Sequence, residues 1–171
     1  LRAGHECDSL DIDPRFTPTL CVNILEWKYK ELPRGYYDVV WASCPCEQYS
    51  TARSKARAPR DLMLADSILL RTREIIDWFS PSCWFIENPA GSLLWRRFKW
   101  KRLVTTSYCS YGFPYRKTTT LATNLDEVFC RGQCGGVGMC SQMIGTQHLA
   151  HAQKGGGGVT DAYHTTDELH R

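Results

Sequence analysis

The sequence lacks the features that would place a chain in a membrane or on a secretory route. No apolar run approaches bilayer-spanning length, and the opening residues carry no signal-peptide pattern. Neither sign of charge is in large excess, since the net charge is only +3. Such a small excess does not prove a nucleic-acid partner unless the cations are clustered. With 171 residues, the chain has one domain's length and enough apolar content to bury a core.

Cysteine, in contrast, is abundant, with nine residues. A secreted disulfide scaffold is also rich in cysteine, but such scaffolds are usually shorter than this chain. The thiols here stand at the ends of apparent strands and in one tight cluster. We therefore expect an intracellular, reducing compartment and no membrane association.

Two short apolar runs each end in a chemically useful side chain. Residues 39–43 lead into a Pro-Cys pair whose thiol belongs to Cys46, and residues 83–86 lead into Glu87. Each run is typical of a buried strand of a parallel sheet, and ligands of open α/β sheets bind at the carboxyl edge. Taken alone, a Pro-Cys is more often a buried structural cysteine and a lone Glu a solvated turn residue. Two such strand ends in one chain favour a site.

The two motifs resemble those of the DNA cytosine-5 methyltransferases. That family has Pro-Cys-Gln followed, one residue later, by an aromatic residue and a serine, and it has Glu-Asn followed by Val or Pro at a later strand end. Here Pro45-Cys46 with Tyr49-Ser50 matches the first motif, and Glu87-Asn88-Pro89 matches the second. The resemblance covers residues 11–123. It implies a class I, Rossmann-like α/β fold with a mainly parallel sheet and flanking helices.

The resemblance also implies an activity, the transfer of a methyl group from S-adenosylmethionine to carbon 5 of a flipped cytosine in DNA. Cys46 would add to carbon 6 as a thiolate, and Glu87 would grip N3 and the exocyclic amine. Further on, the family has Tyr-Gly-x-Pro-Gln-x-Arg-x-Arg, with arginines that brace the cytosine carbonyl. This chain keeps Tyr-Gly-x-Pro, so we expect Arg116 and Lys117 to take that role, while Thr119 stands where the second arginine would be. The variant looks like the compact, phage-type branch of the family, which places the protein in a nucleus, a nucleoid or a host cytoplasm.

The cofactor residues that the resemblance implies lie upstream. An acid at a strand end suits two vicinal ribose hydroxyls, which makes Asp11 a candidate, although a turn before Pro14 explains the Asp-x-Asp pattern about as well. Residues 20–27 predict a third short strand, and Asn23 within it stands where the family usually has an acid that meets the adenine amino group. The candidate cofactor-binding set is Asp11, Ile12, Asn23, Ile24 and Pro45. We expect the family's first strand and Phe-x-Gly-x-Gly loop to be missing from this chain.

Residues 51–60 form a basic loop of small residues directly after the Cys46 motif. Its cations could neutralise phosphates beside a flipped base, whereas the plain alternative is a solvated loop. The candidate DNA-binding set is Ser50, Arg53, Lys55, Arg57 and Arg60. An amphipathic stripe from Leu62 to Phe79, capped by Asp61, then predicts a helix that packs on the sheet.

The tight cysteine cluster lies in a Gly-rich stretch with almost no apolar periodicity. Cys130, Cys134, Cys140 and His148, with His151 as an alternative, are ligands that a tetrahedral structural zinc site uses; free thiols or a disulfide are the alternatives. We therefore divide the chain into residues 1–125, a partial methyltransferase core, and 126–154, a zinc-binding insert in place of a large target-recognition region. Residues 155–171 are a glycine linker and the start of a C-terminal element. Two other functions stay open: a catalytically inactive DNA-binding or scaffolding remnant, and a zinc-stabilised interaction module.

Overall fold

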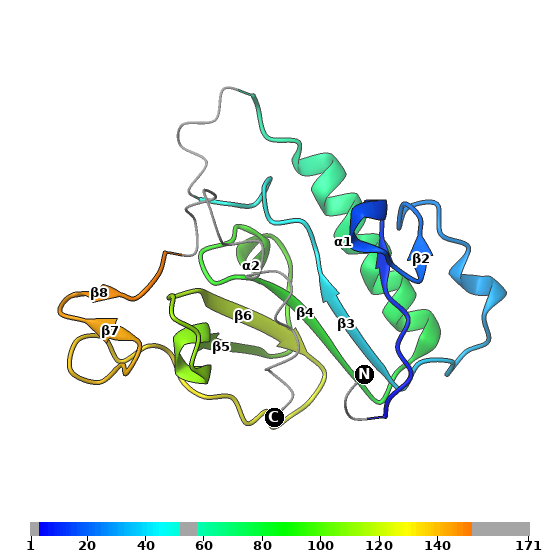
Figure 1. Cartoon of the computed structure of the whole chain (residues 1–171). Coiled ribbons are helices and arrows are strands. Elements are labelled where there is room, and N and C mark those ends of the chain that lie inside the picture. The colour runs from blue at the N-terminus through cyan, green and yellow to red at the C-terminus, as the bar shows by residue number, and fades with distance from the viewer. Residues whose placement is uncertain (1–3, 52–57, 152–171) are drawn as a thin grey trace.

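The computed structural model describes residues 4–51 and 58–151 (Figure 1). Three of the predicted DNA contacts, Arg53, Lys55 and Arg57, and the predicted glycine linker lie outside these residues. The elements, in chain order, are β1 (Leu10–Asp11), η1 (Pro14–Phe16), β2 (Leu20–Cys21), η2 (Tyr29–Glu31), β3 (Val39–Ser43), α1 (Leu62–Phe79), β4 (Cys83–Pro89), α2 (Leu94–Arg97), β5 (Leu103–Ser107), η4 (Tyr108–Tyr111), β6 (Thr118–Thr123), β7 (Met143–Ile144) and β8 (Gln147–His148).

A four-stranded sheet with the order β3-β4-β6-β5 is the centre of the molecule. Strands β3 and β4 are parallel, whereas β6 is antiparallel to both of its neighbours, so β3, β4 and β5 run in one direction. The α/β class is therefore confirmed, but the sheet is mixed and not mainly parallel. The reversal arises because β5 and β6 are joined by a short connection that pairs them side by side.

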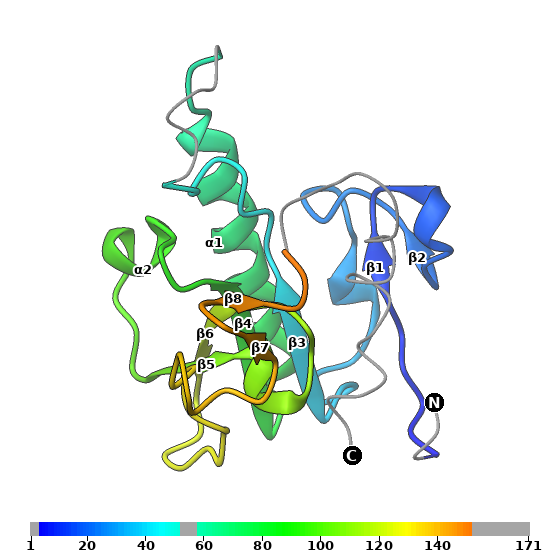
Figure 2. The ribbon, with the colours of Figure 1, turned by 60° about the vertical axis from the view of Figure 1, so that its left-hand side comes forward.

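Helix α1 forms as the apolar stripe predicts. The Asp61 side chain accepts a hydrogen bond from the Leu64 amide, which satisfies one of the amide donors of the first turn. The buried face of α1 packs Leu69 and Ile76 against Ile86 of β4. Figures 1 and 2 show the helix across one face of the sheet, as the connection between the parallel strands β3 and β4.

The opposite face of β3 is open among the described residues. Val39 and Trp41 keep 56% and 52% of their surface exposed, whereas Val40 and Ala42 pack against the core under α1. Within the part of the chain that the structure describes, strand β3 is therefore buried on one face only, and the expectation that residues 39–43 form a buried strand is wrong for the other face. Alternation of side chains along the strand places Val39 and Trp41 together on the uncovered face, where Trp41 meets the Phe85 ring with centroids 5.3 Å apart.

The first strands are shorter than the sequence suggests, and they form a separate parallel pair, β1 and β2. The apolar run that begins at Leu20 leaves the extended conformation at Asn23. The Asn23 side-chain oxygen accepts from the Leu25 amide, and its carbonyl accepts from Glu26 and Trp27, which makes a turn. A second apolar cluster, centred on Tyr29, Ile75 and Phe79, joins this region to α1.

Candidate active site and metal centre

The Cys46 and Glu87 motifs meet at one edge of the sheet. In the parallel register of β3 and β4, Ser43 lies opposite Glu87, so the chain leaves β3 beside the carboxylate and reaches Cys46 three residues later. Asn88 adds a cross-strand contact, because its Nδ2 donates to the Cys44 carbonyl at 2.8 Å. The two candidate catalytic residues thus come from neighbouring strands, at the edge that the strand pattern predicts.

Tyr49, whose side chain is fully buried, anchors the Cys46 loop. The Tyr49 amide donates to the Cys46 carbonyl at 3.0 Å, and the Tyr49 carbonyl accepts from the Leu93 amide at 2.9 Å. The phenol donates to Asp66 Oδ1 of α1 at 2.8 Å, and Asp66 is also paired with Arg97. The loop conformation is therefore fixed by the helix and by the segment after β4.

The Glu87 carboxylate is almost buried and has two partners from β6 or its approach. Thr119 Oγ1 donates to Glu87 Oε1 at 3.1 Å, and Lys117 Nζ lies 3.7 Å from the same oxygen. Lys117 Nζ also lies 4.7 Å from the centre of the Tyr108 ring and 3.4 Å from its hydroxyl. Thr119, at the position of the family's second arginine, thus contacts the glutamate, and Lys117 supplies the cation beside it.

The electrostatics of Cys46 follow from this arrangement. Burial raises the pKa of the Cys46 thiol, and the carboxylates of Glu47 and Glu87 raise it further, while Lys117 acts in the opposite direction. The thiol is therefore mostly protonated near neutral pH in this state of the protein. Cys44, two residues earlier, is buried, and its pKa is raised by burial as well.

The neighbour of Lys117 faces a different region. Arg116 lines a hollow of about 230 Å³ together with His148 and His151. Its positive charge also acts on the thiol of Cys134. The structure therefore brings Lys117, and not Arg116, to Glu87, because successive residues before β6 point to opposite sides of the chain.

The candidate cofactor residues gather at the ends of β1 and β2. Asp11 pairs with Cys21 in the parallel register, which puts Asp11 and Asn23 at the same edge. The Asp11 carboxylate accepts from the Asp13 amide at 2.8 Å, so the turn that the sequence left open is present. Ile12 is 67% exposed beside them, Ile24 packs at the margin of the second cluster, and Pro45 is exposed.

The two described members of the DNA-binding set are Ser50 and Arg60. Arg60 Nη1 donates to the Gln48 carbonyl at 2.6 Å, and the Gln48 side chain accepts from the Asp61 amide at 2.9 Å. Arg60 therefore ties the far end of the basic loop to the Cys46 loop. Ser50 lies directly before the loop and is partly buried.

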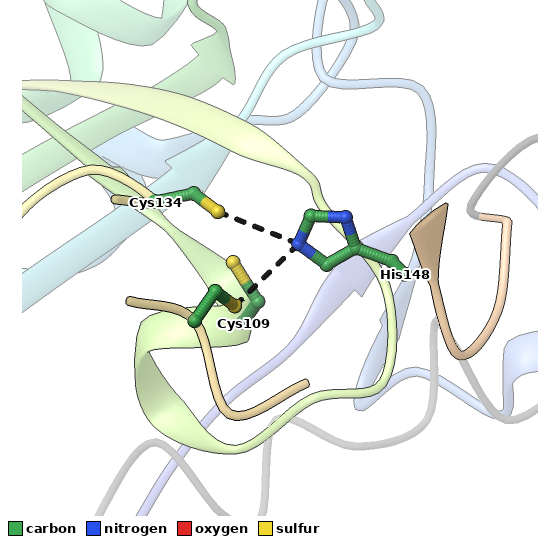
Figure 3. A group of neighbouring side chains, drawn as sticks. Cys109, Cys134 and His148 are labelled. Atoms are coloured by element: carbon green, nitrogen blue, oxygen red, sulfur yellow. Dashed lines mark hydrogen bonds between the residues drawn. The ribbon is translucent and has the colours of Figure 1, made fainter. Parts of the chain in front are cut away.

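A group of four possible metal ligands lies near the carboxyl end of β5, and we call it the metal group: Cys109, Cys134, Cys140 and His148. Their ligand atoms all lie within 4.8 Å of one another. His148 Nε2 is 3.4 Å from the Cys134 sulfur and 3.6 Å from the Cys140 sulfur (Figure 3). Such a cluster of three thiols and one imidazole fits a tetrahedral ion.

The predicted ligand Cys130 is not in the metal group, and Cys109 of η4 takes its place. The sequence argument considered thiols close together in the chain, whereas Cys109 reaches the group only because η4 lies under the insert. Residues 126–151 fold over η4 through several hydrogen bonds, including Ser110 Oγ to the Gly132 carbonyl at 2.8 Å. Cys130 is a free, partly buried thiol, and His151 is exposed.

Comparison with known proteins identifies a viral relative. No family model matches the chain. The chain is similar to a protein of Frog virus 3 (isolate Goorha) named "Probable DNA (cytosine-5)-methyltransferase". The two are 34% identical over 156 residues, which span 83% of this chain and 70% of the viral protein. Among the described residues, no helix has both the length and the apolar character needed to cross a bilayer.

Proposed function

The chain belongs to the DNA (cytosine-5)-methyltransferase family, and we propose that it transfers a methyl group from S-adenosylmethionine to carbon 5 of a cytosine in DNA. The observation that carries this proposal is the pairing of Ser43 with Glu87 in the sheet, because it brings the Cys46 loop and the Glu87 carboxylate to one edge. The shared direction of β3, β4 and β5 and the crossover through α1 support a class I, Rossmann-like arrangement.

In this proposal Cys46 is the nucleophile. Its thiolate forms a bond to carbon 6 of the cytosine, the ring electrons move toward carbon 5, and Glu87 holds N3 and the exocyclic amine while charge develops. After carbon 5 has gained the methyl group and lost its proton, the Cys46–carbon bond breaks and the thiolate is regenerated. A proton shared between Glu87 and N3 weakens the repulsion that now raises the Cys46 pKa.

Lys117 and Thr119 have supporting roles. Both contact the Glu87 carboxylate, and the ammonium of Lys117 balances part of the negative charge that Glu47 and Glu87 place near Cys46. Arg116 lies toward the insert, which makes it a candidate for contact with DNA outside the flipped base. Phosphate contact would come from the basic loop of residues 51–60 and from Ser50.

The edge formed by β1 and β2 fits S-adenosylmethionine. When bound, this cofactor supplies an electrophilic methyl group on a sulfonium. Asp11 offers a carboxylate of the kind that accepts from ribose hydroxyls, and the exposed side chain of Ile12 offers an apolar surface for the adenine. Asn23 would accept from the adenine amino group, with Ile24 and Pro45 as neighbouring contacts.

The metal group is proposed to hold one structural zinc ion. Three thiolates and an imidazole are a tetrahedral zinc set, and soft thiolates disfavour magnesium and calcium. The insert buries little apolar surface of its own, since Phe129, Val137, Met139 and Ile144 are all exposed. A metal ion would therefore supply the folding free energy that packing does not provide here.

A covalent trap tests the methyl transfer. The full-length protein is incubated with S-adenosylmethionine and a duplex that carries 5-fluorocytosine, in which fluorine blocks the proton loss that releases the enzyme. We expect an adduct that survives a denaturing gel. Cys46→Ser should abolish it, because a serine hydroxyl is far less ionised near neutral pH. Glu87→Gln should slow its formation.

Cys44→Ser is the matched control for the trap. Cys44 lies two residues away but is buried and faces Thr72 of α1, with Sγ 3.6 Å from the Thr72 hydroxyl. The Cys44→Ser variant should therefore still form the adduct. An adduct that survives Cys46→Ser, or the absence of any adduct with the unmodified protein, would contradict the proposed mechanism.

A further inference from the structure

We propose that Cys109, a residue of the methyltransferase core, completes the zinc site and thereby couples metal binding to the position of Lys117 in the active site. The inference rests on the zinc ion proposed above, whose ligands include Cys109, and adds its consequence for the active site. Cys109 lies in η4, immediately after β5, and is 3% exposed. The other three ligands, Cys134, Cys140 and His148, belong to the insert. The ion would therefore join two parts of the chain.

The surroundings of the metal group suit a bound ion. The Gly136 amide points at the Cys134 sulfur at 3.4 Å, a contact that orients a ligand sulfur. The Cys134 amide donates to Ser107 Oγ at 3.0 Å, and Ser107 is fully buried at the end of β5. Cys134 is thus positioned by the sheet itself. Figure 3 shows the His148 ring directed at the thiols, which come from separate segments.

Three further hydrogen bonds join the insert to η4 and to Pro114, which lies shortly after η4. The Arg131 amide donates to the Tyr111 hydroxyl at 2.9 Å, and Arg131 Nη1 donates to the Ser110 carbonyl at 3.0 Å. At the far end of the insert, the Ala150 amide donates to the Pro114 carbonyl at 2.7 Å. These contacts hold the insert over residues 110–114 and are all polar, so the metal would add folding free energy that apolar packing does not provide here.

The path from the metal group to the active site is short. Cys109 follows Tyr108, whose ring and hydroxyl contact Lys117 Nζ and whose amide donates to the Lys117 carbonyl at 3.0 Å. Lys117 Nζ in turn lies 3.7 Å from Glu87 Oε1. An ion that fixes Cys109 also fixes Tyr108, and Tyr108 holds Lys117 toward Glu87. Lys117 is the cation that favours the Cys46 thiolate, so metal occupancy bears on the nucleophile.

Ligand identity is tested by comparing Cys109→Ser with Cys130→Ser in protein purified without chelators. Both serines replace partly or fully buried thiols near the insert, but only Cys109 belongs to the metal group. We expect about one zinc ion per chain in the unmodified protein and in Cys130→Ser, and at least about tenfold weaker zinc binding in Cys109→Ser. His148→Cys should retain zinc, since four thiolates also form a tetrahedral site, whereas His148→Ala should lose it.

Cobalt substitution keeps the test decisive if a variant folds poorly. In the unmodified protein, Co²⁺ should give the intense visible bands of a tetrahedral site and a thiolate charge-transfer band. A six-coordinate cobalt spectrum would overturn the assigned site. Zinc retained by Cys109→Ser but lost by Cys130→Ser would overturn the ligand set and leave the zinc ion in place. Zinc absent from every variant would remove the zinc proposal together with this inference.

The coupling has its own measurement, the rate at which amine reagents label Lys117, followed by mass spectrometry. Removal of zinc by a chelator should speed labelling of Lys117 by at least about threefold, because Tyr108 no longer shields the ammonium. Lys30, an exposed lysine whose ammonium also lies over an aromatic ring, 5.8 Å from the Trp78 centroid in the second cluster, is the control and should not change. Equal labelling of Lys117 with and without zinc would overturn the coupling. The adduct test of Cys46 reports on methyl transfer separately.

Discussion

At the scale of single residues, the Cys46 thiol is placed between charges of both signs. Glu47 and Glu87 disfavour its thiolate and Lys117 favours it, while burial disfavours it most. A thiol in this setting has a low reactivity until a neighbouring charge changes. In the proposed mechanism, a cytosine that shares a proton with Glu87 would make that change when the thiolate has to attack carbon 6.

The charge balance gives a prediction about pH. Glu87→Gln removes a negative charge, so the Cys46 pKa should fall and the thiol should be alkylated faster at a given pH. Lys117→Met removes a positive charge, so the pKa should rise and alkylation should slow. The measurement is the rate of iodoacetamide modification of the Cys46 peptide between about pH 7 and 11. Both variants shifting the pH profile in the same direction would contradict the charge arrangement.

The positions of the candidate active-site residues and of the metal group were predictable from the sequence to different degrees. Cys46 and Glu87 could be located because each follows a short apolar run, and the end of a strand is a local property of the sequence. Cys109 could not, because it is separated from the insert by β6, and only the fold shows that η4 lies under the metal group. The contacts of Lys117 and Thr119 with Glu87 depend in the same way on the pairing of β4 with β6.

At the scale of elements, a helix or strand could be predicted where the signals lie within its own segment. Features that depend on pairing between distant segments could not. Helix α1 begins and ends where the stripe and the Asp61 cap predict, since both signals lie within the segment. The direction of β6 was not predicted, because it depends on which strands pair across the sheet. The expected third strand failed at Asn23, whose side chain forms a turn in place of extended pairing.

The contact between α1 and the Cys46 loop gives a second prediction. The Asp66 pKa is lowered, first by the hydrogen bond from Arg97 and also by the Tyr49 phenol. A lowered pKa in the folded state means that the carboxylate stabilises the protein fully above its unfolded pKa of about 3.9, and that this stabilisation is lost as pH falls through the folded value. Asp66→Asn should therefore unfold at lower urea concentration at pH 7, and the difference should shrink below about pH 4.

Asp77→Asn is the matched control for this experiment. Asp77 lies on the same helix and is exposed, so its replacement should leave the urea midpoint nearly unchanged at both pH values. Tyr49→Phe, which deletes only the phenol that donates to Asp66, should cost about 1.5 kcal/mol of unfolding free energy at pH 7. An unchanged midpoint in Asp66→Asn would show that the Tyr49 anchor does not hold the loop.

At the scale of the whole molecule, α1 serves two cores. Its Leu69 and Ile76 side chains pack on the central sheet, whereas Ile75 and Phe79 meet Tyr29 in the second cluster. Arg71 adds polar links on the second side, donating to the carbonyls of Ile24 and Trp27. Figure 2 shows β1 and β2 beside the sheet and not within it. The candidate cofactor edge is therefore attached to the catalytic edge mainly through one helix.

This attachment makes Phe79 the residue whose loss should separate the two halves. Phe79 is fully buried, with ring centroids 4.8 Å from Tyr37 and 6.0 Å from Trp27. Phe79→Ala should cost about 3–5 kcal/mol and should loosen the β1–β2 region first. Hydrogen exchange should then accelerate at the amides of Leu20 and Val22, which donate to carbonyls across that pair.

The matched control is Leu69→Ala, which creates a cavity in the other core. Leu69 is also fully buried, but it packs under the central sheet, so its loss should speed exchange in β4 and β6 as well. In Phe79→Ala, the β4 and β6 amides should stay protected and binding of S-adenosylmethionine should weaken, while Cys46 keeps its alkylation rate. If Phe79→Ala and Leu69→Ala accelerated exchange equally throughout the chain, the two cores would unfold as one unit, and α1 would not act as a separable link between them.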